Sequence, residues 1–220
     1  MRKYEVNITG STPLLMHWDN IDWADKMAEW KDDPSNKKSS KAGDDRSPAW
    51  RWIGSLYHDG EHVGMPSDNL MRCIMEGGAM VPVPGGKNGK TFKAQSQSGM
   101  MVDQPYWTLT TQGKPILMSD VTSLLQCSDF AVHKTTCAAL GFGLHVKRAK
   151  IGASKHVRVR PVFYHWQLSG TVSVWDDAIS DRVLTDILSY AGQYKGLGDW
   201  RPGGKTPGSF GMFSATVKAA

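Results

Sequence analysis

The sequence predicts an α+β fold, and three features of its hydrophobic pattern support this prediction. Apolar and polar residues alternate at 4–10, as they do in strands with one buried face, and 209–217 is predicted to form the closing strand. Apolar residues recur at helical spacing at 66–76 and 178–191, between these two ends. Shorter strand-like segments separate the two helices, so the elements follow the order β-α-ββ-α-β.

The chain opens with the strand 4–10, and Pro13 ends the strand-like pattern soon after it. The inward face of this strand carries Tyr4, Val6 and Ile8. An amphipathic helix is predicted over 18–31, where apolar residues recur at helical spacing. Its apolar stripe consists of Trp18, Ile21, Ala24, Met27 and Ala28. Residues 32–48 are almost wholly polar and predict a mobile loop.

A hairpin is predicted over 53–65, because apolar runs flank an Asp59-Gly60 pair. The helix 66–76 begins at Pro66 and is expected to end at the Gly77-Gly78 pair. The residues on its buried face are Leu70, Cys73 and Ile74.

The middle of the chain contains the larger of two expected insertions. The segment 84–99 holds three lysines and no acid and predicts a second flexible loop. Residues 104–118 predict a pair of short strands, and 119–126 a brief helix. We therefore expect one domain over 1–220, with insertions at about 18–50 and 84–160.

The last third predicts two strands, a helix and a closing strand. Residues 156–160 alternate as His-Val-Arg-Val-Arg, so one face would carry cations while the valines point inward. Residues 162–175 predict one long aromatic and β-branched strand. In the helix 178–191 the apolar stripe is Ile179, Val183, Ile187, Leu188 and Ala191.

Composition favours an acidic partner and a reducing compartment. The formal net charge is +5 and the isoelectric point is about 9.1. The N-terminal segment lacks the apolar core of a signal peptide, and no apolar run is long enough for a membrane helix. The three cysteines, an odd number without CxxC spacing, predict free thiols rather than a disulfide framework. A cytoplasmic protein that does not bind membranes is therefore expected.

A cationic segment is the first candidate binding feature. No Asp or Glu occurs from Phe130 to Trp175. Six cations fall within fourteen residues of this stretch: Lys147, Arg148, Lys150, Lys155, Arg158 and Arg160. Because they would repel one another without a counter-charge, an external polyanion is the expected partner. A solvated basic face is the alternative.

A glycine-rich segment before the closing strand is the second candidate. Its glycines include Gly196, Gly198, Gly203, Gly204, Gly208 and Gly211. Glycine allows backbone N–H groups to approach a phosphate closely. Lys195, Arg201 and Lys205 lie in or beside it and would hold phosphates, and Trp200 would stack on a base. The alternative is an ordinary long loop that uses glycine for its turns.

The sequence gives no convincing catalytic or metal motif. The segment GGKNGKT encloses three residues between Gly85 and Gly89, whereas a Walker A loop needs four. His58 and His62 flank the Asp-Gly turn, so they do not share a helical face as zinc ligands would. The acids Asp19, Asp22 and Asp25 predict an exposed acidic face, with a metal site as the alternative. We expect neither a metal nor a cofactor.

Two segments carry a resemblance to a known family. They are Gly196-Leu197-Gly198-Asp199-Trp200-Arg201-Pro202 and Gly208-Ser209-Phe210-Gly211-Met212-Phe213. Within a ferredoxin-like or RRM-like order of elements, they resemble the glycine-rich loop of the RAMP superfamily, the repeat-associated proteins that build CRISPR effector complexes. The chain is similar to a backbone subunit of those complexes, or to a phage or mobile-element relative. The resemblance implies insertions that grip a guide RNA and touch its target strand.

These features together predict a non-catalytic protein that binds RNA or single-stranded nucleic acid. It would assemble as repeated copies along the strand, alone or with other effector-complex subunits, and Trp18, Trp23 and Trp30 are the candidate contact residues. One alternative is a RAMP-type endoribonuclease that uses His133, His145 or His156 as a general acid or base, or cleaves with an N-terminal aspartate. The other is a structural phage protein without a nucleic-acid role.

Overall fold

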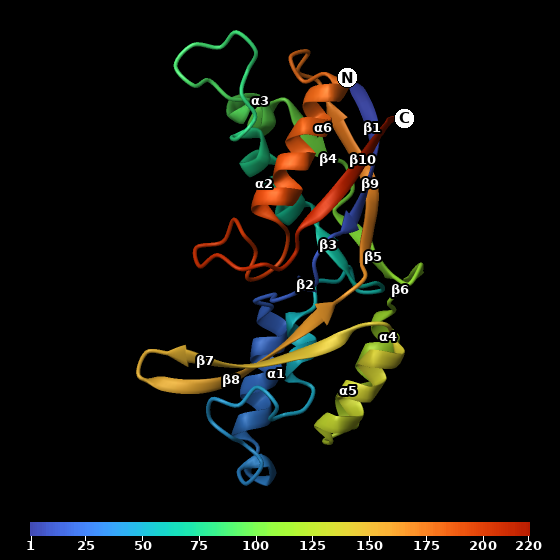
Figure 1. The fold of residues 1–220 in the computed structure, drawn as a ribbon. Coiled ribbons are helices and arrows are strands. Elements are labelled where there is room, and N and C mark those ends of the chain that lie inside the picture. Colours follow the sequence, from blue (N-terminus) through green and yellow to red (C-terminus); the bar gives the residue numbers. More distant parts are fainter.

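The protein is described by a computed structural model of residues 1–220, apart from the side chain of residue 151. It is an α+β fold, as predicted, and the strands of both its sheets pair antiparallel. A helix-covered sheet forms one part and a long hairpin with its own helices forms the other (Figure 1). One hydrophobic core connects the two parts, since it includes Tyr4 and Val172 of the first and Trp52 and Phe163 of the second.

The main sheet has the strand order β10-β1-β9-β5-β3, and β4 and β6 pair with β9 and β5. Its strands are β1 (Arg2–Gly10), β3 (Gly64–Pro66), β4 (Met100–Val102), β5 (Tyr106–Thr111), β6 (Lys114–Pro115), β9 (Gln167–Val174) and β10 (Phe213–Ala219). The opening strand is confirmed, with Tyr4, Val6 and Ile8 buried. The two ends of the chain meet in this sheet, where the Ala220 N–H donates to the Lys3 carbonyl at 3.0 Å.

Three helices cover one face of the main sheet: α2 (Ser67–Gly78), α3 (Lys93–Ser98) and α6 (Asp181–Tyr190) (Figure 1). The predictions of α2 and α6 are confirmed, and Gly77-Gly78 form the last residues of α2. The two helices pack closely because a Cβ on Gly77 would lie 2.6 Å from the Ile187 carbonyl oxygen. A π-helical turn, Ala191–Lys195, extends α6 and leads into the glycine-rich segment.

The opposite face of the main sheet is open and polar. Three of its strands, β1, β9 and β10, present Asn7, Thr9, Ser169, Thr171, Ser214 and Thr216 there. The Ser169 hydroxyl donates to Asn7 Oδ1 at 2.7 Å across two of these strands. Hydroxyl and amide groups thus take the place that an apolar layer would occupy if a second sheet or helix packed on this face.

The second part is built on a three-stranded sheet in the order β2-β8-β7. Its strands are β2 (Leu14–Leu15), β7 (Gly143–Ile151) and β8 (Ser154–Phe163), and its helices are α1 (Ile21–Asp32), α4 (Met118–Thr122) and α5 (Phe130–Ala139). The strands β7 and β8 form the long hairpin that projects from the molecule in Figure 1. Short 3₁₀ turns, Pro34–Asn36, Arg51–Ser55 and Ser123–Gln126, complete this part.

The single strand predicted over 162–175 is wrong. The chain pairs with β2 and β7 as far as Phe163, turns, and pairs with β1 from Gln167 onward. Trp166 fixes this change of sheet, because its ring is buried and its indole N–H donates to the Thr12 carbonyl at 2.9 Å. An apolar run shows that a segment is buried but not which sheet it joins.

Several other predicted elements need correction. The hairpin over 53–65 keeps its turn, where His58 and Val63 form a bridge, but its first arm is a 3₁₀ turn and β3 pairs with β5. The helix α5 was not predicted, because Val132, Thr135 and Thr136 weaken the helical pattern. Its N-terminus is marked by Asp129, whose carboxylate accepts from the Ala131 N–H at 2.7 Å.

The two predicted insertions also differ from expectation. The range 84–160 includes β4 and β5, which belong to the main sheet, and the loop 84–99 contains α3. Within α1 only Met27 of the expected stripe is buried, and Ile21 is 75% exposed. Trp18, Trp23 and Trp30 are half-buried rather than exposed, so they are poor contact residues for assembly. None of the described helices combines the length and hydropathy that spanning a bilayer requires.

Candidate nucleic-acid interface

A groove of 620 Å³ separates the β7–β8 hairpin from the glycine-rich loop, residues 196–212. In Figure 1 both segments project from the same side of the molecule, the loop in red above the hairpin in yellow. The loop is held in place by the segment after β1, since Asp199 N–H donates to the Leu15 carbonyl and Gly211 N–H to the Pro13 carbonyl. The two segments singled out by the sequence therefore face each other.

Most of the predicted binding residues line this groove. Those that do are Lys147, Arg148, Arg158, Arg160, Trp200, Arg201 and Lys205. Lys150 and Lys155 lie near the tip of the hairpin, and Lys195 lies in the π-helical turn, all outside the groove. The groove is thus formed by two segments that are about forty residues apart in sequence.

The cations of the β7–β8 hairpin are divided between its two faces. Residues directly opposite each other on paired strands point to the same face. The pairs His145 with Arg160 and Lys147 with Arg158 therefore belong to one face. The opposite face carries Arg148, Lys150 and Lys155 together with the inner valines. The predicted alternation within 156–160 is correct, but one face does not hold all six cations.

Carboxylates pair with three of the arginines. Arg160 is hydrogen-bonded to Asp199 within the loop, and Arg201 Nη1 lies 2.9 Å from Glu76 Oε2 of α2. Arg158 Nη1 lies 3.4 Å from Asp45 Oδ2, and the same carboxylate also pairs with Arg51. These side chains are fixed in position by their partners, so they shape the groove more than they charge it.

Three other cations keep their charge available. Lys147, Arg148 and Lys205 are exposed, and within the described part of the chain none of them has a carboxylate at ion-pair distance. Lys147 and Lys205 come from the two walls of the groove, whereas Arg148 borders it from β7 with its side chain on the other face of the hairpin. The groove therefore has an unneutralised positive charge that a polyanion would match.

The glycines of the loop are used for packing rather than for binding a phosphate through their amides. The N–H groups of Gly196, Gly203, Gly204, Gly208 and Gly211 all donate to carbonyls of the protein. At Gly211 the backbone has φ +71°, and a Cβ there would lie 1.8 Å from the Leu197 carbonyl oxygen. The expectation that these five amides cradle a phosphate is therefore wrong for this conformation.

An aromatic stack joins the two walls of the groove. Phe210 stacks on Trp200 with ring centres 5.6 Å apart and an angle of 22° between the planes. The Lys147 ammonium lies over the Trp200 ring, 3.6 Å from its centre. His145 meets Phe210 edge-on at 5.6 Å. Trp200 is thus not a free stacking platform. The sequence did not indicate Phe210 as a site residue, and it indicated His145 only as a catalyst in the nuclease alternative.

The three histidines considered as catalysts have different surroundings. His133 is fully buried, accepts from the Trp52 indole N–H at 3.0 Å and lies 2.9 Å from the Cys127 carbonyl, so it is a structural residue. His156 packs against Gly43 and does not line the groove. Of the three, only His145 lies in the groove, and burial together with Lys147 and Arg160 lowers its pKa.

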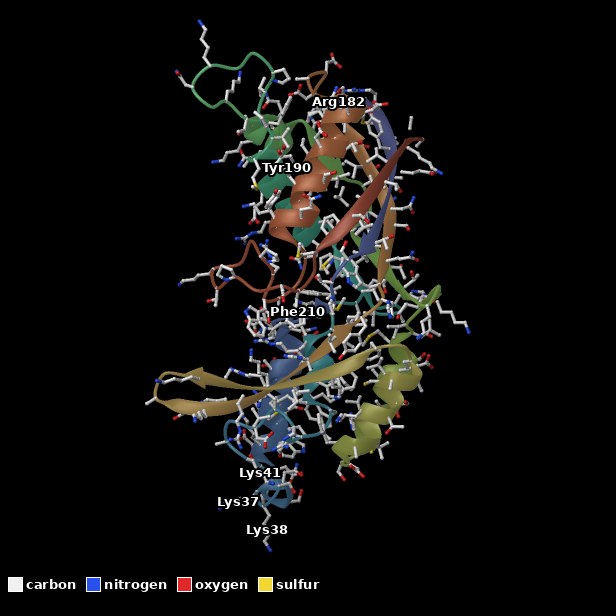
Figure 2. The ribbon with its side chains drawn as sticks, viewed as in Figure 1. Lys37, Lys38, Lys41, Arg182, Tyr190 and Phe210 are labelled. Carbon is white, nitrogen blue, oxygen red and sulfur yellow. The ribbon has the colours of Figure 1, made fainter. Side chains whose placement is uncertain are left out.

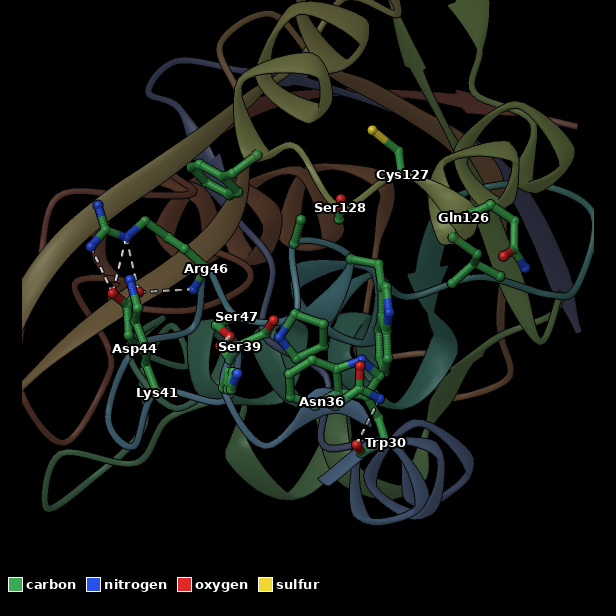
Figure 3. A pocket seen from close by; sticks show the side chains of 16 residues that line it. Trp30, Asn36, Ser39, Lys41, Asp44, Arg46, Ser47, Gln126, Cys127 and Ser128 are labelled. Atoms are coloured by element: carbon green, nitrogen blue, oxygen red, sulfur yellow. Dashed lines mark hydrogen bonds and ion pairs between the residues drawn. The ribbon is translucent and has the colours of Figure 1, made fainter. Parts of the chain in front are cut away.

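Phe210 lies between the loop and the hairpin in Figure 2, whereas Lys37, Lys38 and Lys41 lie at the far lower end of the molecule. A second, larger hollow of 920 Å³ lies near those lysines (Figure 3). Its arginine, Arg46, is bound by Asp44 at 2.6 Å and 2.9 Å. No group of three potential metal ligands occurs among the residues that the structure describes.

Comparison with known proteins does not identify a function for the chain. No protein-family model matches the chain, and no curated protein matches its sequence. The case for a function therefore rests on the groove and its charges.

Proposed function

We propose that the protein binds RNA or single-stranded nucleic acid without cleaving it, in the groove between the β7–β8 hairpin and the glycine-rich loop. The observation that carries this proposal is the convergence of Lys147 from one wall with Lys205 from the other, neither of them paired with a carboxylate among the described residues. Two walls of like charge repel each other, and a chain of phosphates between them relieves that repulsion.

The size of the groove, 620 Å³, and the charges on its two walls favour a strand over a small anion. Arg158, Arg160 and Arg201 are held by carboxylates and keep partly exposed guanidinium groups. Lys147 and Lys205 are exposed on opposite walls, where each can meet a phosphate. Phosphate contacts of this kind are independent of sequence, so we expect affinity with little base preference.

The order of elements supports a ferredoxin-like core of the RAMP type. In such a core the strands β10, β1, β9 and β4/β5 would be the fourth, first, third and second, in the antiparallel order of that fold, with α2 and α6 on one face. The glycine-rich loop directly precedes β10, as it does in the superfamily. The proposal extends to a cytoplasmic protein that assembles as repeated copies along a strand, alone or with other effector subunits.

Charge reversal at the groove tests the proposed function. Lys205→Glu and Lys147→Glu should each weaken binding of a short mixed-sequence single strand roughly tenfold, because each replaces an attraction to phosphate by a repulsion. Lys218→Glu is the matched control, since it makes the same change of charge on the open sheet face and should leave affinity nearly unchanged. Fluorescence anisotropy over a series of salt concentrations measures both effects.

Three outcomes would contradict this proposal. Equal losses in the groove and control variants would mean that only net charge matters, and affinity that does not change with salt would exclude phosphate contacts. Absence of any binding would favour a structural role without nucleic acid. The comparison of RNA with DNA of the same sequence then identifies the preferred strand.

A nuclease is the second candidate, because His145 lies in the groove with a lowered pKa. A neutral imidazole beside two cations is suited to accept a proton from a ribose hydroxyl. If the protein cleaves RNA, His145→Gln should abolish the cleavage while His133→Gln should reduce stability. An intact RNA after long incubation with the wild-type protein supports the binding role instead.

A further inference from the structure

The backbone at Trp200 holds its side chain in an unusual position. Trp200 has φ +52°, a left-handed conformation that bulky residues rarely adopt. Gly208 allows it, because a Cβ on Gly208 would lie 2.0 Å from the Trp200 carbonyl oxygen and 2.4 Å from its Cδ1. A strained residue that its surroundings hold in place often marks a functional position.

The Trp200 ring has two neighbours of different kinds. Phe210 belongs to the same loop and stacks on the ring with an interplanar angle of 22°. Lys147 comes from β7, on the other wall, and its ammonium lies 3.6 Å from the ring centre. Phe210 is thus a fixed support, whereas Lys147 is a long exposed side chain with no carboxylate partner among the described residues.

A nucleobase competes well with an ammonium group for an aromatic ring at a solvent-accessible site. A single exposed cation–π contact is the weaker interaction, because the ammonium must give up part of its hydration. Stacking of a base on tryptophan is stronger and tolerates any base. A strand that enters the groove also provides a phosphate for the displaced lysine, so the cation exchanges one partner for a better one.

We propose that Trp200 is a subsite for one unpaired nucleobase, which Lys147 occupies in the free protein and leaves when a strand binds. This inference rests on the proposed function and specifies it: the ligand must offer an unstacked base, so a single strand binds and a regular duplex does not. Lys147 then pairs with the phosphate next to the stacked base. His145, against the edge of Phe210, marks the other end of the same stack.

Binding of strands with and without bases tests the subsite. The probes are a short single-stranded DNA oligomer, the same oligomer with every base removed, and its regular duplex. Trp200→Leu should weaken binding of the complete oligomer roughly 5- to 100-fold and leave binding of the abasic oligomer unchanged. Trp200→Phe should restore most of the loss, because an aromatic face is what the base requires. The duplex should bind the wild type no better than the abasic oligomer.

The role of Lys147 has its own variant and control. Lys147→Met removes the charge and keeps a long apolar stem over the ring. It should reduce the slope of log affinity against log salt by about 0.7, the value for one phosphate contact of a single strand. Lys218→Met, on the open sheet face, should leave that slope unchanged.

A measurement on the protein without a substitution at Trp200 keeps the proposal testable if a variant loop fails to fold. In the free protein the ring current of Trp200 should shift the Nζ-methyl resonance of ¹³C-methylated Lys147 upfield, and the resonance is identified by its loss in Lys147→Arg. The complete oligomer should move it back, whereas the abasic oligomer should not. If the resonance stays shifted when the complete oligomer is bound, the subsite is wrong although the groove still binds strands. If no oligomer binds at all, the proposed function fails as well.

Discussion

The open face of the main sheet and the groove are two surfaces of one molecule with opposite chemistry. The strands β1, β9 and β10 present rows of hydroxyl and amide groups, with Lys218 and Glu5 opposite each other on neighbouring strands. The groove combines unneutralised cations with the Trp200–Phe210 stack. Of these two surfaces, the proposed binding role fits the groove, because it combines cations with an aromatic stack.

This difference shows that the order of helices and strands does not by itself indicate which surface of the protein is suited to bind a strand. RRM domains bind single strands on the open face of the sheet, through aromatic side chains on their central strands. On the outward positions of β1 and β9 the described side chains include no aromatic ring. The proposed ferredoxin-like core would therefore serve as a support, and the hairpin and the loop would bind the strand.

The largest expected effect is on the unfolding free energy, and it distinguishes a glycine in close contact with other backbone from a glycine in an open turn. Gly211 and Gly113 have φ +71° and +76°, but a Cβ would meet the Leu197 carbonyl at Gly211 and nothing within 4 Å at Gly113. Gly211→Ala should cost on the order of 3 kcal/mol of unfolding free energy, since strain and overlap add. Gly113→Ala should cost about 1 kcal/mol from backbone strain alone. Urea denaturation measures both, and equal losses would show that the loop relaxes around the new methyl group.

A smaller effect is expected for the ion pair that anchors the loop to α2. Arg201→Met leaves Glu76 half-buried with Arg72 as its remaining partner, which should cost about 1–2 kcal/mol. Lys218→Met on the open sheet face should change the unfolding free energy by less than about 0.5 kcal/mol. The double variant Arg201→Met/Glu76→Met should recover much of the loss, because the half-buried carboxylate is then gone and Arg72, which loses its partner, is exposed. A purely additive double variant would contradict the pairing.

Periodicity predicted the parts of the fold in which one face of an element is buried. The strand with Tyr4, Val6 and Ile8 and the helices α2 and α6 have such faces, and the structure contains all three elements. The division of 162–175 between two sheets could not be predicted in this way. It depends on pairing partners at Leu14 and Arg2 that are far away in sequence.

The candidate site was predictable in its location but not in its charge. An acid-free cationic segment and a loop rich in glycine and cations indicated two walls, and the structure places them around one groove. The carboxylates of Asp45 and Glu76, which neutralise Arg158 and Arg201, lie 113 and 125 residues away from their partners. No local pattern reports such pairs, so the sequence could not show which of the cations keep their charge available.

The smallest expected effect is a pH dependence that differs between the groove and the exposed surface. The pKa of His145 is lowered first by burial and then by Lys147 and Arg160. Its contribution to stability is therefore complete above the ordinary histidine pKa and is lost as the pH falls below it, because the unfolded chain takes up the proton more readily. His145→Gln should flatten the fall of the unfolding free energy between about pH 7 and pH 5. Thr216→Val, on the open sheet face, changes no titrating group and should leave the slope as it is. Equal slopes in both variants would mean that His145 contributes no pH dependence, and the aromatic stack of the groove would then be open in solution.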